Sequence, residues 1–204
     1  MTLDTIFDHC YDYLDQSPDC TNYAAVLASA KKSNARGPAP LAKKDAGHVA
    51  AHLPEMDEYK GDGTAKLVSA LTENYQLLDW WNAYDDDTPS GEGFKDATAS
   101  SLLVGPGAPF TSKTGRAGFF YLRNGLTYAP HNHAPDEIYA ILAGQADFWS
   151  ESDGWRRAGP GEIIHTPSWS WHGMKTQNGP VLILWAWTGG GLDTEPSFEG
   201  APNW

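Results

Sequence analysis

Four residues with metal-ligating side chains lie in two short stretches of the C-terminal half of the sequence. His131 and His133 are separated by one residue, Glu137 follows four positions later, and His172 lies much further along the chain. Because side chains alternate between the two faces of an extended strand, we expect His131 and His133 to project on the same side. Glu137 comes after a short turn and begins the apolar run EIYAIL, so its carboxylate can join the two imidazoles. A strand that carries His172 would then close the site from a second part of the fold.

Three imidazoles and one carboxylate form a ligand set that suits a divalent first-row transition metal, which is Zn, Fe, Mn, Co or Ni. An isolated H-x-H pair on a strand is usually inert. Here a spaced glutamate, flanking glycines and a downstream proline before the last histidine accompany the pair, and together they are far more specific. We therefore predict one divalent ion bound by His131, His133, Glu137 and His172, with open positions left for water or substrate.

Tyr139 is the candidate catalytic residue next to this predicted centre. It lies two residues after Glu137, so strand alternation places both side chains on one face. A nearby divalent cation favours the phenolate and lowers the pKa of a phenol, which can then act as a general base. The alternative is that Tyr139 only fills the barrel and bonds water through its hydroxyl. The spacing leaves both interpretations open.

The elements that must position these residues differ between the two halves of the chain. Residues 1–84 carry apolar side chains at steps of three and four, which is the helical period. The clearest stretches are Leu3 to Leu14, Tyr23 to Ala30, and Leu67 to Leu78 after the start signal Gly63-Thr64. A connector rich in Pro and Gly is expected at residues 33–44, and an acidic loop at residues 85–93.

From about Ser100 onward, short β-branched and aromatic runs alternate with Gly and Pro. Many short strands at close spacing predict an antiparallel sandwich or barrel. We therefore expect a mainly β protein, with an N-terminal helical extension at residues 1–98 and a catalytic β-barrel domain at residues 99–204. The helices could cover the mouth of the barrel as a lid or form the interface of a homodimer.

Residues 125–144 resemble the first motif of the cupin family, G-x5-H-x-H-x3-E-x6-G, at every defined position. The second cupin motif is matched by Gly161, Pro167 and His172. The resemblance covers about residues 100–187 and implies a cupin-type antiparallel barrel, the double-stranded β-helix. The second motif often has an Asn shortly after its histidine, where this chain reads GMKTQN. That Asn is not a metal ligand in the family, so the departure leaves the expected ligand set unchanged.

A finer resemblance is carried by the segment YAPHNHAPDEIY, by the phrase DGWRRAGPGE and by VLILWAWTGG. These segments are similar to the cupin-type dimethylsulfoniopropionate lyases, in their DddQ-like branch. Such enzymes cleave dimethylsulfoniopropionate, a small zwitterion, to dimethyl sulfide and acrylate. The resemblance implies Tyr139 as the base that removes the proton α to the carboxylate, and Tyr128 as a pocket residue. Aromatic faces attract the sulfonium cation, so Tyr121 and Trp187 join Tyr128 as candidate substrate-binding residues.

Two alternative functions are compatible with the same predicted metal ligands. One is a cupin dioxygenase or isomerase that acts on another small carboxylate or a sugar, and the other is a non-catalytic ligand-binding cupin. His165, which lies in the second motif region, receives no role.

The composition limits the partners and the location of the chain. A net charge of −12 disfavours nucleic acid and anionic membranes. The sequence contains no apolar run as long as a membrane span and no pattern of a signal peptide. With only two cysteines, neither in a C-x-x-C pair, a reducing cytoplasmic location is expected.

Overall fold

The computed structural model describes residues 2–33, 46–82, 84, 89–91 and 93–204. All of the expected connector at 33–44 except Ser33, and much of the acidic loop at 85–93, lie outside these residues. The helical segments are α1 (Leu3–Asp15), α2 (Thr21–Ser33), α3 (Gly47–Ala50) and α4 (Ala65–Asn74), with 3-10 turns η1 (Pro18–Cys20), η2 (Leu53–Tyr59), η3 (Tyr75–Leu77) and η4 (Lys95–Ala97). The strands are β1 (Thr98–Val104), β2 (Gly115–Leu122), β3 (Leu126–His131), β4 (Asp136–Gly144), β5 (Ala146–Ser150), β6 (Gly154–Ala158), β7 (Ile163–Thr166), β8 (His172–Thr176) and β9 (Val181–Thr188).

The N-terminal helices form where the apolar period predicted them. In α1 the buried side chains recur at three- and four-residue steps, from Ile6 to Leu14. The helix α4 starts directly after Thr64, as the start signal predicted. The Thr64 hydroxyl does not cap the helix; it donates a 2.6 Å hydrogen bond to the carbonyl oxygen of Leu142 in β4. This bond attaches the beginning of α4 to the β-sheet.

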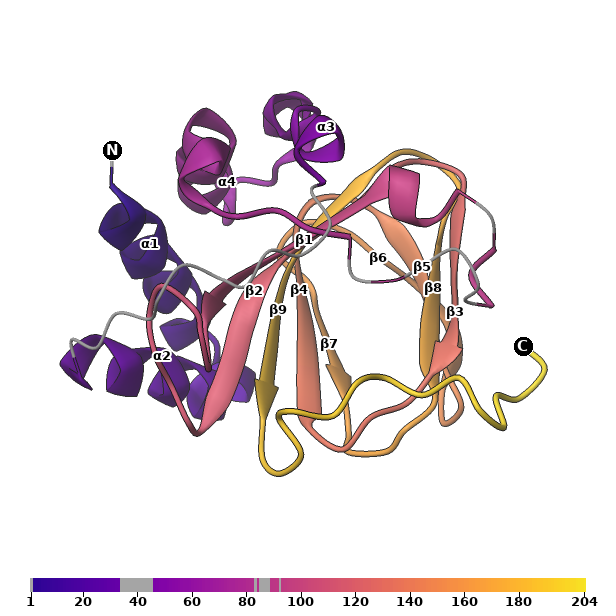
Figure 1. Cartoon of the computed structure of the whole chain (residues 1–204). Coiled ribbons are helices and arrows are strands. Elements are labelled where there is room, and N and C mark those ends of the chain that lie inside the picture. Colours follow the sequence, from indigo (N-terminus) through magenta and orange to yellow (C-terminus); the bar gives the residue numbers. More distant parts are fainter. Residues whose placement is uncertain (1, 34–45, 83, 85–88, 92) are drawn as a thin grey trace.

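The strands form two antiparallel sheets that face each other (Figure 1). The five-stranded sheet has the order β1-β2-β9-β4-β7, and the four-stranded sheet has the order β3-β8-β5-β6. Every pair of neighbouring strands is antiparallel. The prediction of a mainly β, cupin-type antiparallel barrel with N-terminal helices is therefore confirmed.

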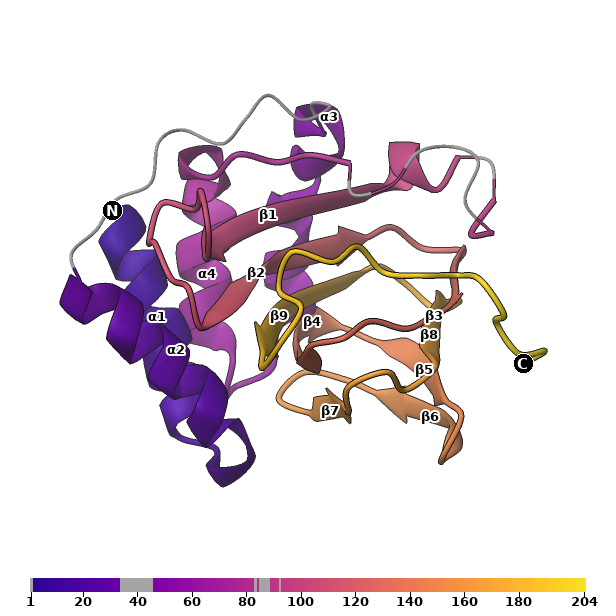
Figure 2. The ribbon, with the colours of Figure 1, turned by 60° about the horizontal axis from the view of Figure 1, so that its bottom comes forward.

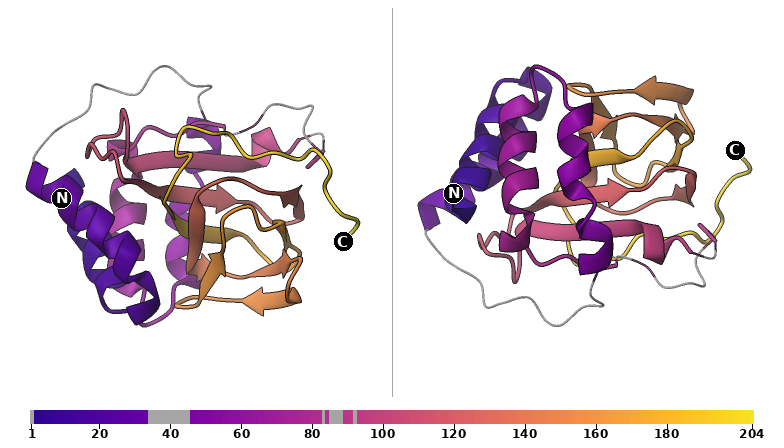
Figure 3. Two further views of the ribbon diagram at one scale, coloured as in Figure 1. Left: turned by 90° about the horizontal axis from the view of Figure 1, so that it is seen from below. Right: turned by 90° about the horizontal axis from the view of Figure 1, so that it is seen from above.

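The five-stranded sheet is apolar on both of its faces. Its outer face carries Leu182, Leu184 and Ile138, which share one core cluster with the helices. Its inner face carries Ile141 and Ile183, which belong to a second cluster inside the barrel. Figures 2 and 3 show the helices lying against one side of this sheet, with the four-stranded sheet on the other side. The helices therefore form a layer behind the sheet and do not lie over the interior of the barrel as a lid.

The outer core cluster is continuous between the helical and the β part of the chain, because it joins Phe7 and Leu71 to Leu103 and Phe119. The expected boundary between residues 98 and 99 falls at the first residue of β1. Among the described residues, no helix has both the length and the apolar character needed to cross a membrane.

Candidate metal centre

The four predicted ligands come together inside the barrel. His131 is the last residue of β3 and lies directly opposite His172, the first residue of β8. His133 lies in the turn after β3, and Glu137 is the second residue of β4. The ligating atoms of the three histidines all lie within 4.8 Å of one another. One carboxylate oxygen of Glu137, Oε2, lies 3.0 Å from Nε2 of His133 and 3.3 Å from Nε2 of His172.

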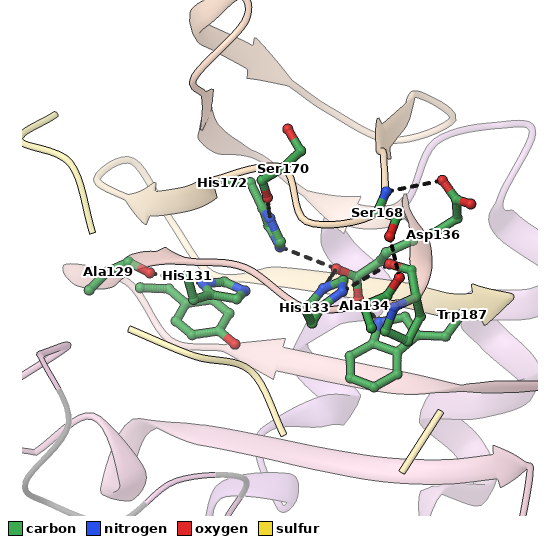
Figure 4. A network of polar contacts seen from close by, with 12 residues as sticks. Ala129, His131, His133, Ala134, Asp136, Ser168, Ser170, His172 and Trp187 are labelled. Atoms are coloured by element: carbon green, nitrogen blue, oxygen red, sulfur yellow. Dashed lines mark hydrogen bonds and ion pairs between the residues drawn. The ribbon is translucent and has the colours of Figure 1, made fainter. Parts of the chain in front are cut away.

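Hydrogen bonds connect the turn that contains His133 with the segment just before His172 (Figure 4). The backbone N–H of Trp169 donates a 2.8 Å hydrogen bond to the carbonyl oxygen of His133. The backbone N–H of Ser168 donates to Oδ1 of Asp136 at 3.2 Å, and its hydroxyl donates to the carbonyl oxygen of Ala134. Residues far apart in the sequence therefore have a fixed relative position before any ligand binds.

All three imidazoles are held in the same tautomer. Each ring places its Nδ1 within 2.9–3.0 Å of a backbone carbonyl oxygen two residues away; the pairs are His131 with Ala129, His133 with Pro135, and His172 with Ser170. A carbonyl oxygen only accepts hydrogen bonds, so Nδ1 must carry the proton. In a neutral ring Nε2 then presents its lone pair, and this is the state that binds a metal.

Within the described part of the chain, two of the three Nε2 atoms are buried without a partner. Among the described residues, Nε2 of His131 and Nε2 of His172 have no hydrogen-bond partner, although both atoms are buried. Leaving such groups unsatisfied costs roughly 1–3 kcal/mol each. When the rings are neutral, the lone pairs on Nε2 of His133 and on Nε2 of His172 face Oε2 of Glu137, which is also an acceptor. This arrangement is unfavourable unless a cation lies between these atoms. The donor set therefore fits a divalent metal ion.

The pKa shifts of His131 and Glu137 suit a metal, whereas the shift of His133 favours a proton on its ring. Burial, reinforced by the neighbouring His172, holds the pKa of His131 well below its usual value, so this ring stays neutral. Burial alone would raise the pKa of Glu137, but the adjacent imidazoles of His133 and His172 outweigh it and lower the pKa below the usual value. The pKa of His133 is raised, because Glu137 outweighs the effect of burial. The centre therefore carries an ionised carboxylate, as metal binding requires.

Trp187 orients Glu137. Its indole Nε1–H donates a 2.6 Å hydrogen bond to Oε1 of Glu137, which leaves Oε2 directed at the imidazoles. Its ring also packs on His133, with centroids 4.6 Å apart. Trp187, expected to bind substrate, lines the cavity and in addition supports two ligands.

A cavity of about 110 Å³ lies next to the ligands and is lined by His131, His133 and Glu137. One water occupies roughly 10–15 Å³ on this measure, so the space can hold a small organic molecule. Tyr139 and Tyr128 also line this cavity. These are the two residues to which the family resemblance assigns a role in catalysis or in the substrate pocket.

Tyr139 lies beside the ligands with its ring centroid 5.9 Å from that of His172. Strand alternation places its phenol on the same face of β4 as Glu137. Burial, followed by the negative charge of Glu137, raises the pKa of Tyr139 well above that of free tyrosine. A positive charge at the centre would act in the opposite direction.

Tyr128 forms the aromatic side of the cavity. Its ring stacks on His131 with centroids 4.1 Å apart, and its hydroxyl shares a hydrogen bond with Tyr84. Phe94 and Phe198 also pack against this ring, at 5.4 and 6.5 Å between centroids.

Tyr121 is not at the site, and the expectation that it binds substrate is corrected. It pairs with Leu182 and belongs to the outer core cluster, among the helices. Adjacent residues of a strand face opposite sides, so Phe120 faces the barrel and lines the cavity in its place.

Sequence reasoning missed Arg116, which also lines the cavity. The sequence offered little to reveal it, since β2 is apolar on both faces apart from this residue. The unassigned His165 lies on β7 with a half-exposed side chain, and its Nε2 is 3.7 Å from Oδ1 of Asp136. It is outside the ligand cluster.

An antiparallel barrel in which three histidines and a glutamate meet defines the class of cupin-type metal centres. The sequence model of the dimethylsulfoniopropionate lyase family matches residues 16–183 of this chain. The chain therefore belongs to the dimethylsulfoniopropionate lyase family.

Individual relatives agree with this assignment. The dimethylsulfoniopropionate lyase DddQ of Ruegeria pomeroyi is 38% identical over 116 residues, and this match spans 57% of each protein, little more than half of the relative's length. The crystal structure of DddQ from Ruegeria pomeroyi DSS-3 is similar over 98% of both chains, with a TM-score of 0.81 and 27% identity. A crystal structure from a study of the lyases RdDddP and RnDddQII shares the fold over 96% of both chains, with a TM-score of 0.79 and 23% identity.

Proposed function

We propose that this protein is a metal-dependent carbon–sulfur lyase that cleaves dimethylsulfoniopropionate to dimethyl sulfide and acrylate by β-elimination. The observation that carries the proposal is the position of Tyr139, a buried phenol that lines a cavity beside three histidines and a glutamate, in a chain of this family. A cytoplasmic location and a homodimer remain predictions from the sequence.

In the proposed reaction Tyr139, as the phenolate, takes the proton from the carbon next to the substrate carboxylate. The electrons of that C–H bond form the C=C bond of acrylate. The C–S bond breaks and its electron pair stays on sulfur, so the sulfonium leaves as neutral dimethyl sulfide. The leaving group therefore needs no proton.

A divalent ion held by His131, His133, Glu137 and His172 would supply Lewis acidity at the substrate carboxylate and a positive charge that favours the Tyr139 phenolate. The protein itself supplies a rigid, largely aromatic enclosure. The rings of Phe120, Trp185 and Trp187 line the cavity, and each such ring attracts a desolvated cation by about 0.5–2 kcal/mol.

The proposal is tested with the purified protein loaded in turn with Zn, Fe, Mn, Co and Ni. Dimethyl sulfide in the headspace and acrylate in solution are expected in equal amounts. Tyr139→Phe should lower kcat by about 10²–10⁴-fold, the usual contribution of a general base, while the bound metal, measured by elemental analysis, stays constant.

Tyr121→Phe is the matched control, because this hydroxyl lies on the outer face of the sheet. Its kcat and KM should equal those of the unmodified protein. Absence of dimethyl sulfide with every metal, or full activity of Tyr139→Phe, would contradict the proposal.

A further inference from the structure

Arg116 lies in a row of three side chains that ends at the metal centre. In the strand register Arg116 of β2 is opposite Trp187 of β9, and Trp187 is opposite Glu137 of β4. Directly opposed residues of antiparallel strands share a face, so all three project into the barrel. Two strand spacings place the Cα atom of Arg116 about 10 Å from that of Glu137. A side chain as long as arginine can therefore direct its charge into the cavity between them.

Within the part of the chain that the structure describes, the guanidinium of Arg116 has no carboxylate partner. Its Nε is buried without a hydrogen-bond partner, and no described residue forms an ion pair with it. Gly105 makes room for its aliphatic part, since a Cβ atom there would lie 3.0 Å from Cγ of Arg116. A buried donor without a partner is costly, unless a ligand supplies the acceptor.

We propose that Arg116 binds the carboxylate of the substrate, and this inference rests on the proposed function. The planar guanidinium matches the two oxygens of a carboxylate. As the proton moves from the α-carbon to Tyr139, negative charge develops on these oxygens, and Arg116 stabilises it with hydrogen bonds that are already in place. Arg116 thereby selects substrates that carry a carboxylate and sets which end of the zwitterion faces the base.

Glu195 offers the competing explanation. It also lines the cavity, and it belongs to the segment that follows β9. If Arg116 served only to attract this carboxylate and hold the segment closed, Glu195→Gln would reproduce the effect of removing Arg116.

The first test measures binding without turnover. The probe is 3-(methylthio)propionate, which has the carboxylate but no sulfonium leaving group, and its primary amide is the neutral counterpart. By titration calorimetry on metal-loaded protein, Arg116→Met should weaken carboxylate binding by about 10–100-fold, as expected for a charge-assisted hydrogen bond. The amide should bind the two proteins equally, and Arg116→Lys should be intermediate.

The second test measures kinetics and metal content on the same variants. Arg116→Met should lower kcat/KM for dimethylsulfoniopropionate by at least about 100-fold, with unchanged bound metal and melting temperature. Arg123→Met, which removes an exposed arginine just after the same strand, is the matched control and should behave as the unmodified protein.

Equal carboxylate affinity in Arg116→Met and the unmodified protein would overturn the inference, and so would an equal loss in Glu195→Gln. Different results would contradict the proposed lyase function and the proposed role of Arg116. A protein that binds the carboxylate through Arg116 but releases no dimethyl sulfide contradicts only the lyase function. An active lyase that is indifferent to Arg116→Met contradicts only the role of Arg116.

Discussion

At the scale of single residues, the backbone determines which nitrogen of each histidine is free. Three carbonyl oxygens hold the Nδ1 protons of His131, His133 and His172, so the Nε2 atoms converge without needing a proton of their own. The same contacts restrict ring rotation, which lowers the entropy lost when an ion binds. The ligand geometry is therefore built into the folded chain.

Trp187 restrains the carboxylate of Glu137 in a similar way, through a hydrogen bond. Replacing it in Trp187→Phe keeps an aromatic ring but removes the donor to Oε1 of Glu137. We expect metal affinity to fall by about 10–100-fold, the usual effect of losing a partner of a metal ligand. Competition with a chelating dye measures this affinity.

Trp185→Phe provides the comparison for that variant. Trp185 lies on the same face of β9 and lines the cavity, but it makes no hydrogen bond to a ligand. Its replacement should leave metal affinity unchanged, and an equal loss in both variants would show that ring size matters and the N–H does not.

At the scale of elements, the glycines at the two ends of the first cupin motif have different tasks. Gly125 and Gly144 both have positive φ, at 83° and 73°. A Cβ atom at Gly125 would meet nothing within 4 Å, whereas one at Gly144 would lie 1.9 Å from the carbonyl oxygen of Pro180. Gly144 is therefore required both for its backbone angle and for the close approach of the chain before β9.

This difference predicts unequal costs for the same substitution. Gly125→Ala should lower the free energy of unfolding by about 1–2 kcal/mol, the cost of a left-handed residue with a side chain. Gly144→Ala should cost at least about 2 kcal/mol more, because the backbone at Pro180 must also move. Urea denaturation compares the two variants, and equal costs would contradict the steric argument.

The helical layer contributes stability to the sheet that carries the ligands. Leu71 of α4 is completely buried in the outer core cluster, while Leu77 in η3 is 45% exposed. Leu71→Ala should lower the free energy of unfolding by about 2–5 kcal/mol, as for other buried leucines. Leu77→Ala should change it by less than about 0.5 kcal/mol. Urea titration distinguishes them, and a small effect of Leu71→Ala would mean that the helices are not part of the cooperative fold.

At the scale of the whole molecule, the segment after β9 runs across toward the other sheet (Figure 1). Glu195 and Pro196 of this segment line the cavity. Ser197 pairs with Asn132, between two of the ligands in sequence, and Phe198 packs 5.7 Å from His131. Further along, Trp204 stacks on Trp155 with centroids 4.9 Å apart. The barrel is therefore closed partly by a segment that carries none of the ligands.

Phe198→Ala should open the cavity to water while leaving the ligands in place. Loss of one aromatic contact is worth about 0.5–1.5 kcal/mol, so kcat/KM should fall by up to about tenfold with metal content unchanged. Acrylate formation gives the rate, and Glu199→Gln, at the exposed neighbouring residue, should have no effect. An unchanged rate in Phe198→Ala would show that this segment does not contribute to closure.

Local features of the sequence were enough to predict the candidate metal ligands and the type of each main element. The H-x-H pair, the spaced glutamate and the helical periods depend on residues close together in the chain, so strand alternation and helix geometry are enough to interpret them. The family resemblance added the cupin-type fold and the prediction that Tyr139 is the base.

Tertiary structure decided which residues of the apolar strands face the cavity. In β2 and β9 both faces are buried, one by the barrel and one by the helices. No alternation of polar and apolar residues then marks the inner face, which is why Tyr121 was assigned to the wrong side and Arg116 was missed. Only the register of β2 with β9, and of β9 with β4, aligns Arg116 and Trp187 with Glu137.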